Sequence, residues 1–309
     1  MNKIQVSQGH ERSISLEVFL KSFLTLNKTQ QSKFCLHVFE EDLTRALASM
    51  QISFDIKKDC VFIVGSALKC NFLKSIHSSK SFTSLESALE NISDGDILLT
   101  LPTSKDQLFD SNNHYTGHTD YFRKRFNKED IVMLFVSEHI NLALLTEHIS
   151  LSEVEDKIKR ELILSKISNL VSSSFDFKRF IFTGINPHCG ESGLIGSKDE
   201  LLKNTIKVLG EAHKELVFEG PISGDTFLSN TVTTKKSDCF ISPFHDQGLA
   251  PFKAISGYRA SNITIGLPFL RLSPDHGTAF ELYDKDKANY FGTLFTMKLA
   301  LEKLGHNGN

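Results

Sequence analysis

Short apolar runs alternate with stretches of helical periodicity along the chain. The apolar runs predict strands at residues 3–8, 34–39, 60–64, 96–102, 131–136, 142–145, 179–183, 238–241 and 262–266. In the first helical stretch, Ile14, Val18, Phe19 and Phe23 recur on one helix face, and the same spacing predicts helices at residues 40–49, 84–90, 151–170, 201–215 and 288–304. Strands that alternate with helices are typical of an α/β fold with a mostly parallel sheet.

Two local signals refine the predicted boundaries. Ser197 with Glu200 forms a capping-box pattern ahead of the helix at 201–215. Pro243, Gly248 and Pro251 predict an irregular loop over residues 242–253, since proline lacks an N–H and glycine tolerates positive φ. The loop would start where the strand at 238–241 ends.

The length of the chain indicates more than one core. A single core stops growing at about 250–300 residues, and this chain has 309. We find neither an internal repeat nor a low-complexity linker, so we expect two lobes that are joined by crossing strands.

Charge and composition narrow the class of protein. The 35 basic and 37 acidic side chains nearly cancel without a basic block, which argues against nucleic acid or an anionic membrane as the main partner. The sequence has neither the apolar run of a signal peptide nor one long enough to span a bilayer. Five cysteines without a CxxC pair suit a reducing cytoplasm, where we expect the protein to reside.

Polar groups concentrate in four segments near predicted strand ends, at residues 117–120, 146–148, 186–193 and 242–253, and each segment contains a histidine. Ligands of open α/β sheets bind at the carboxyl ends of strands. Three neutral imidazoles, His148, His188 and His245, would leave a divalent cation with open positions for substrate. A hydrogen-bonded structural role is the alternative for each one, and we assign it to His10, His37, His77, His114, His139, His213 and His306.

Two further patterns suit anions. Residues 186–193 are punctuated by glycine and lead into a helix, whose first N–H groups can cradle an anion, although neither a P-loop nor a GxGxxG pattern is present. Cys189 is a poor candidate for a nucleophile beside His188, because adjacent residues in a turn point apart. Lys253, Asn262 and Arg271 form a polar series in apolar sequence, suited to a phosphate or carboxylate; solvated surface cations are the alternative.

These segments resemble the 4-hydroxythreonine-4-phosphate dehydrogenase family of vitamin B6 biosynthesis. The resemblance is dense over residues 96–304 and thin over 1–95. It is carried by Gly117-His-Thr-Asp-Tyr121, Thr146-Glu-His-Ile-Ser-Leu151, Asn186-Pro-His-Cys-Gly-Glu191, Phe244-His-Asp-Gln-Gly-Leu-Ala-Pro-Phe-Lys253, Asn262-Ile-Thr-Ile-Gly-Leu-Pro-Phe-Leu-Arg271 and Asp275-His-Gly-Thr-Ala279.

The resemblance implies a two-lobed α/β fold of the isocitrate and isopropylmalate dehydrogenase kind, with a mostly parallel sheet and helices on both faces. Residues 1–112 and 247–309 would form the first lobe. Residues 113–246 would form the second, which would carry the metal ligands and the dimer interface. The resemblance also implies a homodimer with each active site at the subunit interface, and binding of NAD without a Rossmann fingerprint.

The resemblance also implies a role for each matching residue. His148, His188 and His245 would hold a divalent metal such as zinc, magnesium or cobalt. The phosphorylated substrate would contact His118, Thr119, Lys253, Asn262 and Arg271. NAD, or NADP, would lie along His276, Gly277 and Asn289. Lys253 and Asp246 would act in catalysis, Lys253 by anchoring the substrate or moving a proton and Asp246 by orienting an imidazole or helping to ligate the metal.

The implied reaction is oxidation of 4-phosphohydroxy-L-threonine and decarboxylation to 3-amino-2-oxopropyl phosphate. A metal that binds the substrate hydroxyl lowers its pKa and can also stabilise the enolate left by carbon dioxide. Three other interpretations stay open: the same chemistry on 4-phosphothreonate or 4-phosphoerythronate, a non-catalytic protein that binds a phosphorylated ligand, and a metal hydrolase.

The chain departs from the family pattern at its first turn. The family usually has Gly-Asp/Glu-Pro-x-Gly-Ile-Gly there, whereas this chain reads Gly9-His-Glu-Arg-Ser-Ile-Ser15. The Pro-x-Asn-Lys of the family appears as Pro102-Thr-Ser-Lys105. Bulkier residues in the turn could alter how it meets substrate or cofactor.

Overall fold

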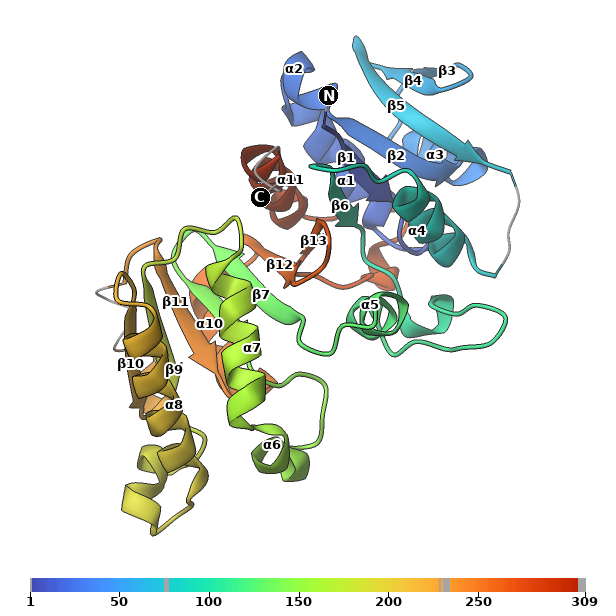
Figure 1. Ribbon diagram of the computed structural model, residues 1–309. Coiled ribbons are helices and arrows are strands. Elements are labelled where there is room, and N and C mark those ends of the chain that lie inside the picture. Colours follow the sequence, from blue (N-terminus) through green and yellow to red (C-terminus); the bar gives the residue numbers. More distant parts are fainter. Residues whose placement is uncertain (1, 75–77, 228, 230–233, 305–309) are drawn as a thin grey trace. The chain divides into compact units, whose positions relative to one another are not determined.

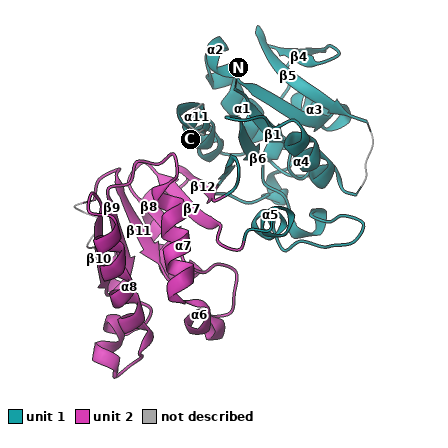
Figure 2. Cartoon of the chain, in the orientation of Figure 1, with its two compact units in different colours: residues 1–128, 267–309 teal, residues 129–266 magenta. Residues whose placement is uncertain are grey.

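The computed structural model describes residues 2–74, 78–227, 229 and 234–304. The chain forms two compact units, residues 1–128 with 267–309 and residues 129–266 (Figure 2). The predicted lobes changed over near residues 112 and 246. The structure instead includes helix α5 (His118–Phe126) in the first unit, and helix α10 (His245–Ser256) and strand β12 (Ala260–Ile265) in the second.

The described strands of the first unit follow the order β13-β6-β1-β2-β5-β4-β3. Strands β13 to β5 in this order are parallel, and β4 and β3 are antiparallel additions. Every residue of β1, β2, β6 and β13 is buried, so both faces of this part of the sheet are covered. The strands are β1 (Ile4–Ser7), β2 (Phe34–Phe39), β3 (Phe54–Ile56), β4 (Cys60–Ile63), β5 (Ser66–Leu73), β6 (Ile97–Thr100) and β13 (Leu270–Pro274).

Helices pack on this sheet (Figure 1). Helix α4 covers β1, β2 and β6, while α11 covers β6 and β13 and also contacts α1. Ser79 caps α4, because its side chain accepts a hydrogen bond from the backbone N–H of Phe82. Besides α5, the helical segments are α1 (Ser15–Thr25), α2 (Lys28–Gln31), α3 (Glu40–Ser49), α4 (Lys80–Glu90), α11 (Phe291–Lys303) and the 3-10 turns η1 (Lys105–Gln107) and η4 (Phe280–Leu282).

The second unit has the strand order β10-β9-β11-β8-β7-β12. Strands β10 to β8 in this order are parallel, and β7 runs antiparallel to both β8 and β12, which confirms the predicted strand pair at 131–136 and 142–145. Its core includes Phe135, Leu142, Phe240 and Phe252. The strands, besides β12, are β7 (Val132–Ser137), β8 (Asn141–Leu144), β9 (Arg179–Thr183), β10 (Val217–Ile222) and β11 (Asp238–Ser242).

The helices of the second unit correct two predictions. The helix predicted at 151–170 is two helices, because Ile158 and Lys159 have extended backbone. The capping box predicted at Ser197 is wrong: its backbone is already helical, and it makes no side-chain cap hydrogen bond to the described part of helix α8. The helical segments besides α10 are α6 (Leu151–Lys157), α7 (Arg160–Val171), α8 (Lys198–Ala212) and the 3-10 segments η2 (Pro187–Gly193) and η3 (Gly224–Thr226).

The structure also bears on the predictions made for the cysteines and for membrane-spanning segments. All five cysteines are free, and Cys35, Cys70 and Cys239 are buried as core residues. Among the described helices, none combines the length and apolar character needed to cross a bilayer.

A buried polar network centred on His37 joins β2 to its neighbours. The ring Nε2 of His37 lies 2.9 Å from the side-chain oxygen of Gln5, and its Nδ1 lies 2.9 Å from the hydroxyl of Ser87. Gln5 offers an acceptor, so Nε2 carries the proton and Nδ1 accepts. The ring is fully buried, and burial lowers the pKa of His37 to about 4. His37 is therefore a neutral structural histidine, as the sequence predicted.

We expect His37 to make the fold acid-sensitive. The unfolded chain takes up this proton at a pKa of about 6.5, but the folded chain only near pH 4. Stability is therefore fully present above pH 6.5 and falls by about 3 kcal/mol as the pH drops toward 4. Urea unfolding across this range should show a flatter pH dependence in His37→Gln than in the parent. His114→Gln, at an exposed site, is the control; equal slopes in all three proteins would contradict the assignment.

Candidate active site

His148 and His245 face each other in the second unit. Their ring centres are 5.5 Å apart, and both line a cavity of about 220 Å³. His148 follows the end of β8 and His245 follows the end of β11, and these strands are parallel neighbours. The carboxyl ends of neighbouring parallel strands meet at one edge of a sheet, so the fold itself brings the two imidazoles together.

Backbone hydrogen bonds continue the pairing of β8 and β11 beyond both strands. The N–H of Leu145 donates to the carbonyl of Ser242 at 2.9 Å, and the N–H of Thr146 donates to that of Pro243 at 3.0 Å. The Thr146 hydroxyl donates to the same Pro243 oxygen at 2.7 Å. His148 itself has a φ of +54°, a left-handed conformation that costs a side-chain-bearing residue about 1–2 kcal/mol. Such strain concentrates at functional sites.

Helix α10 carries His245 on its first residue, which corrects the prediction of an irregular loop at 242–253. The helix continues through Pro251 even though this residue cannot donate to the carbonyl one turn earlier. Gly248 is required by packing: a Cβ there would lie 2.8 Å from the Cβ of Ser242 and 3.0 Å from the side chain of Leu142. The glycine thus lets the helix approach β8 and β11 closely.

Gln247 fixes the start of α10, a role that the sequence analysis missed. Its side-chain oxygen accepts hydrogen bonds from the hydroxyls of Thr183 and Ser242, at 2.8 and 2.9 Å. Its amide N–H donates to the carbonyl of Gly184 at 2.7 Å. The amide therefore ties the helix to the ends of both β9 and β11. The signal in the sequence was a lone amide between His245 and Gly248.

Asp246 contacts the imidazole beside it. Its Oδ1 lies 2.7 Å from Nδ1 of His245, and its side chain is otherwise exposed. A carboxylate on Nδ1 favours the tautomer that leaves Nε2 available to a cation. Lys253 lies two turns further along α10 on an exposed position, and its predicted role stays a prediction.

His188 lies in η2 within a left-handed turn, with φ between +44° and +75° from His188 to Ser192. Its Nδ1 lies 2.7 Å from Glu191, which raises the pKa of this exposed imidazole. Burial raises the pKa of Cys189, whose thiol donates to the carbonyl of Pro221. A raised pKa opposes the thiolate that a nucleophile needs.

Asp199, in the first turn of helix α8, binds the turn that precedes this helix; the anion cradle predicted at the first N–H groups of the helix stays a prediction. Asp199 accepts the backbone N–H groups of Ile185 and Asn186, at 2.7 and 3.1 Å. It also accepts a hydrogen bond from the Asn186 side chain at 3.1 Å. These donors therefore stabilise the turn itself.

The imidazole pair fits part of a metal site. With metal–nitrogen bonds of about 2 Å and a tetrahedral angle, two imidazole centres bound to one cation are about 5 Å apart, close to the separation of His148 and His245. Within the described residues of one chain, no three His, Cys, Asp or Glu side chains form a group that could hold a metal ion. His188 as the third ligand stays a prediction.

The first unit places Arg271 and His118 together. Arg271, on β13, is 3% exposed, and its Nε and Nη2 donate to the hydroxyl of Thr100 on β6 at 3.0 and 2.6 Å. The ring of Phe122 lies against both side chains, 5.8 Å from the guanidinium carbon and 6.3 Å from the His118 ring centre. Thr119 is buried in the first turn of the same helix, α5.

The electrostatics of this cluster favour an anion. Burial lowers the pKa of Arg271 to about 9. Burial, reinforced by the charge of Arg271, also lowers the pKa of His118 well below 6.5, so this imidazole is neutral. A guanidinium in a dry environment gains much from a phosphate or carboxylate, because charge-assisted hydrogen bonds strengthen as water is excluded.

Asn262 offers a buried acceptor in the second unit. Its Oδ1 is buried and has no hydrogen-bond partner among the residues that the structure describes. Asn262 lies on β12, opposite Phe135 of β7. A buried polar atom without a partner is costly, which makes this oxygen a candidate for accepting a hydrogen bond from a ligand.

Residues 276–289 contain the predicted cofactor ligands. Nδ1 of His276 donates to the carbonyl of Gly277 at 3.1 Å, and its Nε2 accepts from the hydroxyl of Thr293 at 2.9 Å. Burial lowers the pKa of His276, so the ring is neutral. Gly277 is exposed, and no described atom would lie within 4 Å of a Cβ there. Asn289 is also exposed, and its side-chain oxygen accepts the N–H of Phe291 at 2.9 Å.

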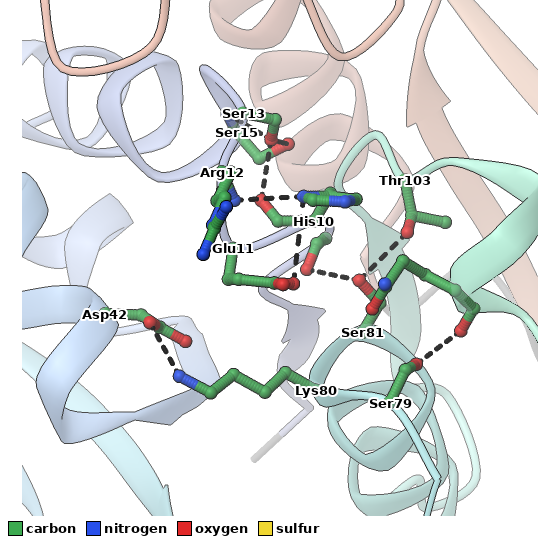
Figure 3. Close-up of polar contacts among 12 residues, drawn as sticks. His10, Glu11, Arg12, Ser13, Ser15, Asp42, Ser79, Lys80, Ser81 and Thr103 are labelled. Carbon is green, nitrogen blue, oxygen red and sulfur yellow. Dashed lines mark hydrogen bonds and ion pairs between the residues drawn. The ribbon is translucent and has the colours of Figure 1, made fainter. Parts of the chain in front are cut away.

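The turn at residues 9–15, which departs from the family pattern, is held by hydroxyl groups (Figure 3). The hydroxyl of Ser15 donates to the carbonyl of Pro102 at 2.8 Å, and that of Ser13 to the carbonyl of His10 at 2.7 Å. Ser81 donates to the carbonyl of Gly9 at 2.7 Å. Serine side chains thus hold the turn in which the sequence departs from the proline- and glycine-containing pattern given above.

The same turn packs against the segment that carries the predicted cofactor ligands. The His10 ring meets the edge of Phe280 at 4.9 Å between centres. The N–H of Ile14 donates to the carbonyl of Thr278 at 3.1 Å. An altered residue in the turn therefore acts directly on residues 278–280.

Comparison with solved structures identifies the class of fold. Isocitrate dehydrogenase from Methylococcus capsulatus matches at a TM-score of 0.51 and 11% identity, over 99% of this chain and 87% of that one. A 4-hydroxythreonine-4-phosphate dehydrogenase from Burkholderia phymatum matches at 0.75 and 24%, over 98% of both chains. The fold is therefore that of the isocitrate dehydrogenase-like α/β proteins, as predicted.

Sequence comparison identifies the family. Residues 16–300 match the profile of the pyridoxal phosphate biosynthetic protein PdxA, and the chain belongs to this family. Curated relatives include 4-hydroxythreonine-4-phosphate dehydrogenases from a Sulfurihydrogenibium species and from Aquifex aeolicus. Both are 31% identical to this chain. The alignment with the Sulfurihydrogenibium protein covers 97% of this chain and 98% of that protein. The alignment with the Aquifex aeolicus protein covers 98% of each chain. The family, which the motifs predicted, is confirmed.

A matched pair of glycine substitutions tests the packing that positions His245. Gly248→Ala introduces the contacts with Ser242 and Leu142, and overpacking of this kind costs about 1–3 kcal/mol. Gly210 lies in helix α8, and outside the backbone of that helix no described atom would lie within 4 Å of an added Cβ. Gly210→Ala should therefore stabilise the folded protein by about 0.5–1 kcal/mol. Chemical denaturation should show shifts of opposite sign. A stabilising Gly248→Ala would contradict the close approach.

Proposed function

We propose that this protein oxidises 4-phosphohydroxy-L-threonine with NAD as hydride acceptor and decarboxylates the product to 3-amino-2-oxopropyl phosphate. The observation that carries the proposal is the dry cationic cluster of Arg271 with neutral His118, which suits the phosphate ester of such a substrate. Membership of the PdxA family, whose curated relatives bear the name of this dehydrogenase, supports it.

Each substrate-binding residue is assigned by its chemistry. Arg271 would bind the phosphate oxygens with its N–H groups, oriented by the hydroxyl of Thr100. His118 and Thr119 would add a ring N–H and a hydroxyl at the start of α5. The buried Oδ1 of Asn262 would accept from an O–H or N–H of the substrate. Lys253 would exchange a proton with the substrate.

The cofactor and metal assignments follow the residues that fit them. NAD, or NADP, would lie along His276, Gly277 and Asn289, where Gly277 leaves open space for it. Zinc, cobalt or magnesium would be held by His148 and His245, with Asp246 orienting the second imidazole. When bound, such a cation supplies Lewis acidity to the substrate hydroxyl and to the carbonyl that replaces it.

We further propose that the protein acts as a homodimer with the active site at the interface. Large apolar side chains lie exposed beside the predicted metal ligands: Leu151 follows His148, and Leu194 follows the turn of His188. A second copy of the chain that covered this surface could also supply His188 as the third imidazole. The incomplete ligand set in the described part of one chain motivates this assignment.

The purified protein should form NADH from 4-phosphohydroxy-L-threonine in the presence of a divalent cation. His245→Ala should reduce turnover to background while its circular dichroism spectrum stays that of the parent. If NADH forms from 4-phosphothreonate or 4-phosphoerythronate but not from 4-phosphohydroxy-L-threonine, the proposed substrate is wrong and the reaction type is kept. Binding of the phosphorylated ligand without formation of NADH would favour a non-catalytic binding protein. Release of phosphate in the absence of NAD would favour a hydrolase. An active His245→Ala would exclude His245 as an essential metal ligand.

Arg271→Ala should weaken substrate binding much more than it slows turnover. A charge-assisted hydrogen bond contributes about 1.5–3 kcal/mol, so the Michaelis constant should rise about 10- to 100-fold. Arg259→Ala is the control, since this arginine pairs with Glu138 at an exposed position. Steady-state kinetics on both variants would decide. An unchanged Michaelis constant in Arg271→Ala would remove it as the phosphate anchor.

A further inference from the structure

A buried ion pair involves the residue next to His148 in the second unit. Nζ of Lys166, on α7, is 3.0 Å from Oε2 of Glu147, the residue before His148. The two side chains are only 3% and 1% exposed. The same ammonium lies 3.4 Å from the carbonyl of Leu144, the last residue of β8. One cation therefore contacts the chain at two points within four residues of His148.

The position of Lys166 on its helix is unusual. Helix α7 buries Ile163, Ile167 and Leu170, and Lys166 belongs to the same stripe. A hydrocarbon side chain is expected there, because burying a charge is costly unless it is paired. Replacing a buried ion pair with apolar residues is often neutral or stabilising, so stability alone does not explain this pair.

We propose that the Glu147–Lys166 pair is a positioning device for His148. The backbone of His148 is left-handed and strained, and such a conformation persists only where its surroundings over-determine it. Thr146 is fixed to Pro243 on one side of Glu147, and Lys166 holds Glu147 itself. With both anchors in place, residues 146–148 present the imidazole to His245.

Glu147 is also one of the residues that line the cavity containing both imidazoles. Its carboxylate is engaged by Lys166 at 3.0 Å, and among the described residues it forms no three-ligand group with the two imidazoles. We therefore assign the pair a role in holding the backbone of His148 and not in binding a cation. This inference concerns residues of this chain, and its link to a metal rests on the proposed function.

The test uses Glu147→Gln, Lys166→Met and the double variant, with Glu138→Gln as the matched control. Glu138 lies in the same unit and pairs with Arg259 at an exposed position. Two quantities are measured on the full chain as purified, in whatever oligomeric state it has. The first is the imidazole ¹⁵N resonance of His148 in the metal-free protein, assigned with His148→Gln. The second is a titration with Co²⁺ alone, followed by its visible absorption.

We expect each single variant to move the His148 resonance and to weaken Co²⁺ binding by about 10- to 100-fold, the usual effect of losing an outer partner of a metal ligand. The double variant should recover thermal stability, because no unpaired buried charge remains, but not Co²⁺ affinity. Lys166→Arg, which keeps the cation, should restore part of both readouts. Glu138→Gln should behave as the parent.

Distinct results would overturn the two proposals. If the variants lose thermal stability while the His148 resonance and Co²⁺ affinity stay at parent values, the pair is structural and the positioning role is wrong. A double variant that regains full Co²⁺ affinity together with its stability leads to the same conclusion. If the parent binds no Co²⁺, the metal assignment in the proposed function falls, while the His148 resonance still decides the positioning role.

Discussion

The register between two parallel strands determines the arrangement of the imidazole site. Strands β8 and β11 pair side by side, and the bonds from Leu145 to Ser242 and from Thr146 to Pro243 extend that pairing past both ends. After β8 the chain continues to His148, whose backbone is left-handed and strained, and after β11 it continues into helix α10. A slip of this register would separate His148 from His245, because each imidazole follows its own strand by only a few residues.

Much of the fold could be predicted because the apolar pattern directly reflects burial. The strand at 34–39 and the helix at 40–49 match β2 and α3, since all of β2 is buried and α3 has a clear apolar face. Helix α10 could not be predicted by the same rule. Its glycine and proline normally disrupt helices, but here packing requires the glycine, and only the neighbouring strands reveal that requirement.

The candidate site also has a part that the sequence predicted and a part that it did not. Its residue types were visible in the motifs, and the structure brings His148 to His245 and His118 to Arg271. The supporting residues were not visible, because their partners are remote in sequence. Gln247 contacts Thr183 on β9, and Glu147, in the loop after β8, contacts Lys166 on helix α7. A pattern along the chain carries no information on such pairs. His188 makes a local contact with Glu191, and its role as the third ligand stays a prediction.

The boundaries of the two units have a consequence for how such proteins diversify. Residues 129–266 form one uninterrupted insertion that holds every imidazole of the proposed metal site, whereas Arg271 and His118 belong to the flanking segments. Recombination that exchanged this insertion between relatives would transfer the proposed metal ligands as a block and leave Arg271 in place. Lys253 and Asn262, which lie in the same insertion, would move together with the metal ligands.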